Sequence, residues 1–183
     1  MEQIMISKAF LIPTGNEIKD GTVLDLDCPK IMEQLVRLNP EMEITRLSPV
    51  VDVEERIVET MQICLKNHAD LIVLVGGSGG GHRFSETLGK DFTHSAMEMW
   101  LDQKVAHEIY GKNGHMWSKL ICGKKGDCFV VNVPGPLREA TAVAKALVES
   151  IRESGDLHVI NRAMSEAVFQ QYPQEKVERN VEL

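Results

Sequence analysis

The sequence predicts an α/β fold with a doubly wound, mostly parallel sheet, helices on both faces (a three-layer α/β/α arrangement) and a C-terminal β-hairpin element. Residues 71–75 form a continuous apolar run, which is typical of a strand buried on both faces of a parallel sheet. Strand-like segments alternate with segments of helical periodicity from the N-terminus onward. Two later strand-like runs, 117–122 and 128–133, are separated by Gly123-Lys-Lys-Gly126, which favours a hairpin.

The first half of the chain supplies two strand–helix pairs. Residues 4–12 are apolar and predict a strand, which ends in the turn Thr14-Gly-Asn-Glu17. Pro29 suits the first turn of a helix, and residues 43–51 predict the second strand. Asp52, with a glutamate three positions later, predicts the capped start of the next helix. The apolar positions that recur at helical spacing are Ile31, Met32, Leu35, Val36 and Leu38, then Ile57, Met61, Cys64 and Leu65.

The second half continues the pattern. Ser85 or Thr87 predicts the start of a helix that runs past Trp100, and Pro136 opens another. The inward positions of that later helix are Leu137, Ala140, Val143, Ala144, Leu147, Val148 and Ile151. We expect a domain over residues 1–155 and a C-terminal helical extension over 156–183, with a helix within 157–172 and a frayed tail at its end.

Composition narrows the function classes. The chain has 183 residues and 43% hydrophobic content, enough for one domain with a sizeable core. Its formal charge of −7 argues against a nucleic-acid partner, because phosphate neutralisation dominates such binding. No apolar run approaches the roughly 18 residues that a membrane span requires. The start of the chain has an acid where a signal peptide carries positive charge, so we expect a cytoplasmic protein without a membrane partner. Four scattered cysteines are expected to be free thiols.

Three loops fall at the carboxyl ends of the predicted strands, where ligands bind in doubly wound sheets. They are residues 13–17, 76–84 and 134–136. The second begins with five glycines and one serine over 76–81. Glycine accepts positive φ and allows backbone N–H groups to approach a ligand, so successive N–H groups form an anion-binding nest. A flexible loop without a ligand is the alternative.

Two familiar phosphate motifs do not fit this glycine-rich turn. A P-loop requires Lys and then Ser or Thr after the position of Gly81, whereas His82 and Arg83 follow. A dinucleotide fingerprint that starts at Gly77 requires glycine where His82 stands. The turn therefore indicates a different kind of anion site.

Five segments of the sequence match motifs of one known protein family, in the same order and at similar spacing. They are Ile12-Pro-Thr-Gly-Asn-Glu-Ile18, Lys19-Asp-Gly-Thr-Val-Leu-Asp25, Val50-Val-Asp52 with Ile57, Leu71-Ile-Val-Leu-Val-Gly-Gly-Ser-Gly79, and Val131-Asn-Val-Pro-Gly-Pro-Leu-Arg-Glu139. They resemble the "TGdEl" turn, the "G-x-i-x-D" stretch, the "v-x-D-d…I" helix start, the strand-plus-"GGTG" signature and the "LPGxP" turn of the molybdopterin-binding domain of molybdenum-cofactor biosynthesis (MoCF) proteins. That domain occurs in molybdopterin adenylyltransferases (MogA and MoaB types), molybdotransferases (MoeA type) and CinA proteins. The resemblance covers roughly residues 4–150.

The resemblance implies a small anionic pterin or nucleotide ligand, namely molybdopterin or the molybdenum cofactor. The family's glycine turn and Pro-Gly turn bracket the phosphate and pterin. Ligand-binding positions are then Thr14, Gly15, Gly76, Gly77, Ser78, Gly79, Gly80, Gly81, His82, Arg83, Ser85, Pro134, Gly135, Pro136 and Arg138. Asp52 and Glu17 are the candidate catalytic residues, and Asp52 is the candidate Mg²⁺ ligand. A helix cap and a surface turn are the alternative roles of these two acids. Family members commonly form dimers or trimers, so we expect a homo-oligomer.

One position departs from the family pattern. The family carries an aspartate a few residues after the glycine turn, as in "GGTGxxxxD", and this chain has Phe84 there. A phenyl ring cannot bind Mg²⁺ or take a proton, so either Glu86 or Asp91 replaces the acid, or the adenylyl-transfer chemistry is reduced or absent. Three functions remain open: adenylyl or molybdate transfer in cofactor synthesis, a non-catalytic molybdopterin-binding module, and a CinA-like nucleotide pyrophosphatase.

Overall fold

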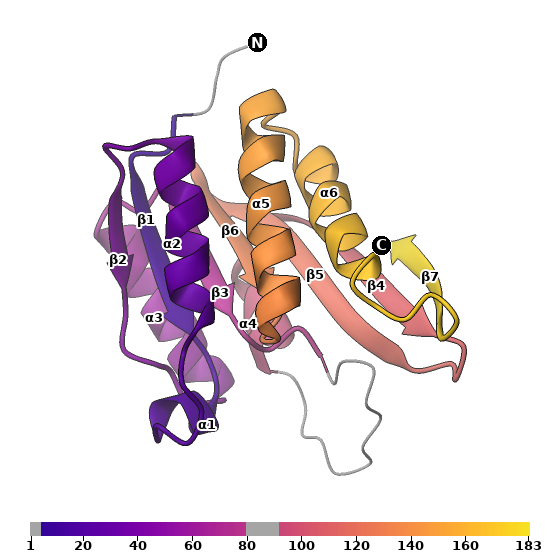
Figure 1. The fold of residues 1–183 in the computed structure, drawn as a ribbon. Helices are drawn as coiled ribbons and strands as arrows, with labels where there is room; N and C mark the ends of the chain where they lie inside the picture. Colours follow the sequence, from indigo (N-terminus) through magenta and orange to yellow (C-terminus); the bar gives the residue numbers. More distant parts are fainter. Residues whose placement is uncertain (1–4, 80–91) are drawn as a thin grey trace.

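A sheet of seven strands in the order β2-β1-β3-β6-β5-β4-β7 divides the molecule into layers (Figure 1). This is a computed structural model, and it describes residues 5–79 and 92–183. Helices cover both faces of the sheet, so the predicted fold class is confirmed.

Four strands form the parallel half of the sheet: β1 (Lys8–Pro13), β2 (Glu43–Arg46), β3 (Leu71–Val75) and β6 (Cys128–Val133). The second strand is shorter than predicted, although Val50 still forms an isolated parallel bridge with Thr14. Pro13 pairs with Val75, and Val75 pairs with Val133. The carboxyl ends of β1, β3 and β6 therefore lie at one level of the sheet.

The antiparallel half contains β5 (Met116–Lys125), β4 (Gln103–Gly111) and β7 (Val177–Glu182). The predicted hairpin between β5 and β6 is confirmed, but Lys125 pairs with Cys128, so its turn is tighter than expected. The sequence did not predict β4. The expected frayed tail was wrong, because β7 pairs with β4 at the edge of the sheet (Figure 1).

The helices form two layers. α2 (Asp27–Leu38), α5 (Leu137–Glu153) and α6 (Leu157–Phe169) cover one face, whereas α3 (Glu54–Lys66) and α4 (Phe92–Trp100) cover the other (Figure 1). The short α1 (Asn16–Lys19) follows β1 at the carboxyl edge. None of the described helices is long and apolar enough to cross a membrane.

The core lies on both sides of β3. Leu71, Val73 and Val75 pack in the cluster under α2, α5 and α6, and Ile72 and Leu74 pack in the cluster under α3 and α4. Burial of each such side chain contributes about 1.5–3 kcal/mol to folding.

Two predicted inward residues lie outside the core. Val36 is 47% exposed and Leu137 is 39% exposed. Helical spacing marks a wide apolar stripe, and these two side chains lie at its margin.

Candidate functional site

Three loops at the carboxyl ends of β1, β3 and β6 meet at one edge of the sheet. The N–H of Thr14, after β1, donates to the carbonyl of Val75 at 2.8 Å. The N–H of Gly76, after β3, donates to the carbonyl of Val133 at 2.9 Å. A Cβ added to Gly135 would lie 3.9 Å from the Cα of Gly76. The glycine turn and the Pro-Gly turn are therefore neighbours.

The described part of the glycine turn has the backbone shape that only glycine tolerates well. Gly76, Gly77 and Gly79 have φ of 101°, 68° and 122°. A Cβ at Gly76 would lie 2.9 Å from the carbonyl oxygen of Thr14, closer than such contacts occur. The carbonyl of Ser78 accepts a hydrogen bond from the N–H of Lys119 at 2.7 Å, which ties the turn to β5. The turn is therefore held in one conformation by the positive φ of its glycines, by its close approach to Thr14 and by its hydrogen bond to Lys119.

Several predicted site residues lie outside the part of the chain that the structure describes. They are Gly80, Gly81, His82, Arg83 and Ser85, together with Phe84 and the possible replacement acids Glu86 and Asp91. Their assignment to the ligand stays a prediction.

The first loop is held by its own hydrogen bonds. The Thr14 side chain is buried, and its hydroxyl donates to the carbonyl of Val75 at 3.3 Å. The hydroxyl of Thr93 in α4 donates to the Thr14 hydroxyl at 3.5 Å. The N–H of Gly15 donates to the carbonyl of Val50 at 3.1 Å. The Thr14 side chain thus fixes the loop against β3 and α4, and its backbone lies beside the glycine turn.

Asp52 lies beside this loop and does not cap a helix. The N-cap of α3 is Val53, which has no side-chain cap hydrogen bond, so the predicted capping role of Asp52 is wrong. Instead, the N–H of Asp52 donates to the Oδ1 of Asn16 at 3.3 Å. Burial, and then the charge of Glu17, raise the pKa of Asp52. The carboxylates of Asp52 and Glu17 therefore repel one another. Because Asp52 does not cap α3, helix capping does not explain why an acid stands at this position.

Asp52 and Glu17 supply only part of the oxygen ligands that a hard cation such as Mg²⁺ requires. No group of three or more His, Cys, Asp or Glu side chains that could hold a metal ion occurs within residues 5–79 and 92–183. Asp52 and Glu17 offer carboxylate oxygens, and Mg²⁺ is commonly bound by one or two carboxylates with ligand phosphates and water completing its shell. These two residues could contribute to an Mg²⁺ site that a phosphate ligand completes.

The Pro-Gly turn opens directly into α5. Pro136 is the N-cap of this 17-residue helix and has no side-chain cap hydrogen bond. Gly135, Pro136 and Arg138 are exposed, whereas Pro134 is buried. The first N–H groups of a helix lack intrahelical partners and attract anions. The start of α5, beside the glycine turn, therefore offers a second set of donors.

Sequence reasoning did not single out Glu139, Tyr172 or Ser118. Glu139 is only 8% exposed, and the hydroxyl of Tyr172 donates to its Oε2 at 3.4 Å. Burial raises the pKa of Glu139 to about 7, which outweighs the opposing effect of the Tyr172 hydrogen bond. A glutamate in the first turn after Pro136 was a visible signal, but nothing in the sequence pairs it with a residue so far along the chain.

A family model described as a probable molybdopterin-binding domain matches residues 10–153. A search of curated proteins finds no significant match. A crystal structure of the molybdopterin biosynthesis enzyme MoaB from Thermus thermophilus is 19% identical, with a TM-score of 0.59, and the match covers 90% of this chain and 97% of that one.

Two further solved structures have the same fold. The tungsten cofactor synthesizing protein MoaB from Pyrococcus furiosus is 16% identical with a TM-score of 0.58, covering 87% of this chain and 98% of that one. The molybdopterin biosynthesis Mog protein from Mycobacterium ulcerans is 19% identical with a TM-score of 0.55, again covering 87% and 98%. At these identities the likeness establishes the fold, and the family match rests on residues 10–153.

Proposed function

Because the chain belongs to the molybdopterin-binding domain family of molybdenum-cofactor biosynthesis, we propose that it binds molybdopterin or the molybdenum cofactor where the glycine turn meets the Pro-Gly turn. One observation carries the proposal: a Cβ at Gly135 would lie 3.9 Å from the Cα of Gly76, so the glycine turn and the Pro-Gly turn lie side by side. Both features suit a phosphate group.

The chemistry of recognition follows from the loops. The N–H groups of the glycine turn beyond Gly76, whose own N–H donates to the carbonyl of Val133, bind the phosphate together with the uncapped start of α5. Arg138 supplies a charge that is mildly unfavourable for the empty helix but favourable beside an anion. His82 and Arg83 are proposed to flank the phosphate on the basis of sequence.

We propose adenylyl or molybdate transfer as the reaction. Asp52 and Glu17 would hold Mg²⁺, which as a Lewis acid neutralises phosphate charge when it is bound. The raised pKa of Asp52 supports this assignment, because a cation between two repelling acids relieves their repulsion. The protein's own part is to bind and orient the phosphate at the two turns.

Isothermal titration with molybdopterin, and separately with its adenylylated form, tests the binding proposal. We expect saturable binding near micromolar dissociation constants, about −8 kcal/mol. Arg138→Ala should weaken binding, and Arg152→Ala, at the far end of the same helix, is the matched control. Failure of both pterins to saturate the protein would reject the proposal.

A non-catalytic binding module is the second candidate, and Phe84 at the usual position of the acid favours it. It predicts pterin binding without turnover, and no gain in Mg²⁺-dependent activity in Phe84→Asp. Incubation of wild type and variant with molybdopterin, ATP and Mg²⁺ separates the candidates, because product from the wild type excludes this one. A parallel incubation with ADP-ribose and a divalent metal tests the CinA-like pyrophosphatase.

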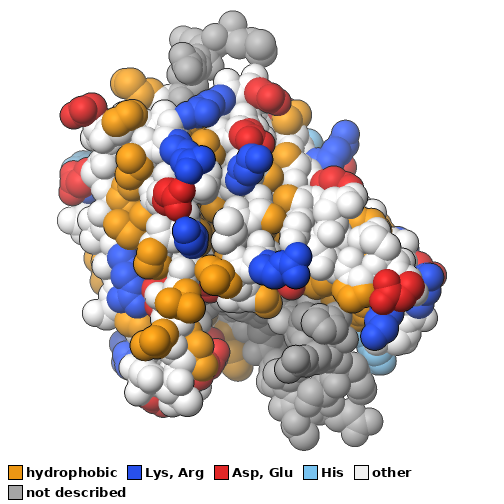
Figure 2. Space-filling model, viewed as in Figure 1, with side chains coloured by type: hydrophobic (Ala, Val, Ile, Leu, Met, Phe, Trp, Pro, Cys, Tyr) orange, Lys and Arg blue, Asp and Glu red, His pale blue; other side chains and the backbone are white. Residues whose placement is uncertain are grey.

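A homodimer or homotrimer in the cytoplasm completes the proposal. Figure 2 shows hydrophobic side chains gathered over α1 and the segment that leads to α2, and Val23, Leu24 and Leu26 are 47%, 77% and 56% exposed. Exposed apolar patches commonly mark protein interfaces. Light scattering coupled to size exclusion measures the oligomeric state, and a monomer at micromolar concentration would contradict the assignment.

A further inference from the structure

The C-terminal segment reaches the candidate site through one side chain. Tyr172 follows α6 and lies beyond residues 10–153, which the family model matches. It is 3% exposed, and its hydroxyl donates to Glu139, the third residue of α5. Glu139 lies within one helical turn of the Pro-Gly turn. A residue outside the matched family region therefore contacts the helix start that faces the anion.

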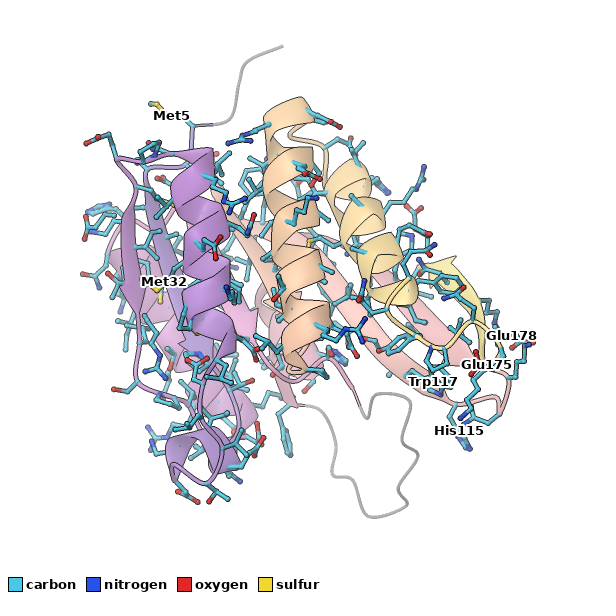
Figure 3. All side chains as sticks on the ribbon, in the orientation of Figure 1. Met5, Met32, His115, Trp117, Glu175 and Glu178 are labelled. Carbon is cyan, nitrogen blue, oxygen red and sulfur yellow. The ribbon has the colours of Figure 1, made fainter. Side chains whose placement is uncertain are left out.

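A second line of contacts runs from Tyr172 to the glycine turn. The rings of Trp117 and Tyr172 meet edge to face, with centroids 5.2 Å apart at 85°. The Trp117 carbonyl oxygen would lie 3.2 Å from a Cβ at Gly79. Figure 3 shows Trp117 near the lower end of β5, on the side where the chain passes from α6 to β7. Tyr172 thus contacts α5 through Glu139, and it contacts the ring of Trp117, whose backbone borders the glycine turn.

We propose that Glu139 is a positioning and charge-selecting residue of the anion site: buried in the first turn of α5 and hydrogen-bonded by Tyr172, its carboxyl controls how well a phosphate docks at the start of that helix. The inference rests on the proposed function and adds to it a residue that selects the charge of the ligand. It also gives the C-terminal segment a role at the site.

The physical reason is competition between two negative charges at one helix start. A carboxylate in the first turn of a helix is ordinarily stabilised by the helix dipole, and an ionised Glu139 would occupy that field and repel a phosphate. Burial disfavours the ionised form, and it raises the pKa of Glu139 to about 7. Above that pH, binding of a phosphate should be accompanied by uptake of one proton at Glu139.

The other charged and titratable groups around Glu139 do not remove the link between its ionisation and phosphate binding. Within the described residues, burial and the Tyr172 hydroxyl are the influences on its carboxyl. From β5, Ser118 lies near Tyr172, whose own pKa is raised first by burial and then by Glu139. On α2, which packs on α5, Lys30 and Arg37 both pair with Glu33. Arg138, the neighbouring cation, is exposed.

Titration with molybdopterin between pH 6 and pH 8 tests the inference. We expect the affinity of the wild type to fall by about tenfold more than that of Glu139→Gln over this range, a typical size for coupling between two sites. The glutamine keeps the shape and removes the titration of Glu139, so its profile reports the ligand's own phosphate, whose second pKa is about 6, together with the groups that both proteins share. Among these is Asp27 at the start of α2, whose pKa is raised to about 6 by burial and then by the charge of Asp25. Glu153→Gln, an exposed glutamate on the same helix, should behave like the wild type.

A second variant and a second measurement distinguish failure of this inference from failure of the proposed function. Tyr172→Phe removes the hydrogen bond that lowers the pKa of Glu139, so the step in affinity should move to higher pH. In the unliganded protein, carbon NMR of the Glu139 carboxyl should give a midpoint near pH 7, and a midpoint below pH 5 would overturn the inference. Identical pH profiles for wild type and Glu139→Gln would overturn it while leaving the proposed function intact. Absence of pterin binding in every variant at every pH would reject both.

Discussion

Cysteine side chains provide the first test at the scale of single residues. Cys28, Cys64, Cys122 and Cys128 are all buried and all free, as the sequence predicts. Burial raises the pKa of Cys64, Cys122 and Cys128 to about 12. Because the thiolate is the reactive form, we expect no reaction with a thiol reagent such as Ellman's in the native protein and four equivalents after denaturation. Rapid modification of the native protein would contradict this burial.

Glu139 makes a prediction about stability that needs no ligand. The folded protein holds the Glu139 proton up to about pH 7, whereas the unfolded chain releases it near 4.5. The wild type therefore loses stability as the pH rises from about 4.5 to about 7. Glu139→Gln should match the wild type at pH 4 and exceed it at pH 8 by at most about 3 kcal/mol, at about 1.4 kcal/mol per pKa unit. Urea unfolding at both pH values measures the difference, and an equal difference at the two values would argue against a raised pKa.

Gly76 and Gly126 form a matched pair. Both have positive φ, but a Cβ at Gly76 would lie 2.9 Å from the Thr14 carbonyl, whereas one at Gly126 meets nothing within 4 Å. Gly126→Ala should lose about 1–2 kcal/mol from its backbone conformation alone. Gly76→Ala should lose more and should also weaken pterin binding, because its loop must shift. Thermal unfolding and titration measure both, and equal effects of the two substitutions would contradict a close contact at Gly76.

At this scale the sequence predicted backbone roles better than side-chain roles. Gly76 is predictable because a tight turn after a buried strand leaves few alternatives to glycine, whereas Gly135 is marked only by the resemblance of its Pro-Gly turn to the family. The spacing of Asp52 to Glu55 predicts a helix cap, yet α3 begins after Val53. Spacing alone cannot tell which residue of a loop turns toward a helix, because tertiary contacts such as that of Asn16 decide it.

At the scale of elements, β7 offers the clearest prediction. This strand is polar, with the sequence Val-Glu-Arg-Asn-Val-Glu, and it covers the edge of β4. Glu182 on β7 also pairs with His158 and Arg162 of α6. A chain that ends at Lys176 should melt at lower temperature and aggregate more readily, because the edge of β4 becomes open. Deletion of Leu183 alone removes one hydrogen bond to β4, from its N–H to the Ala106 carbonyl, and should therefore have a much smaller effect than the loss of the whole strand.

The outcome for this truncation is measured by calorimetry and light scattering. An unchanged melting temperature would contradict a stabilising role of β7 at the edge of β4.

The elements that sequence reasoning missed share a physical cause. In β4 the buried positions include His107, whose Nδ1 lies 2.6 Å from the Oδ1 of Asn161 in α6. A histidine at an inward position interrupts the apolar alternation that predicts a strand. The polar β7 gains its order from pairing with β4. Both strands depend on partners distant in sequence, and local patterns do not report such partners.

At the scale of the whole molecule, the parallel half of the sheet explains why the fold was predictable. β3 is buried along its whole length between two helix layers, so its composition identifies it without any partner. The position that we predicted for the ligand site followed from topology, because loops at the carboxyl ends of parallel strands meet at one edge. The antiparallel half carries Trp117, whose ring contacts Tyr172, and this contact between distant parts of the sequence is visible only in three dimensions.

Backbone amide NMR during titration with molybdopterin tests the central claim most directly, because it reports on the two turns separately. A single anion site predicts saturable shifts of the amides of Gly76, Gly77, Gly79, Gly135 and Leu137 with one common dissociation constant, while Gly126 at the opposite edge stays unchanged. Saturable binding that leaves those five amides in place, or that moves the two turns with different dissociation constants, would contradict it.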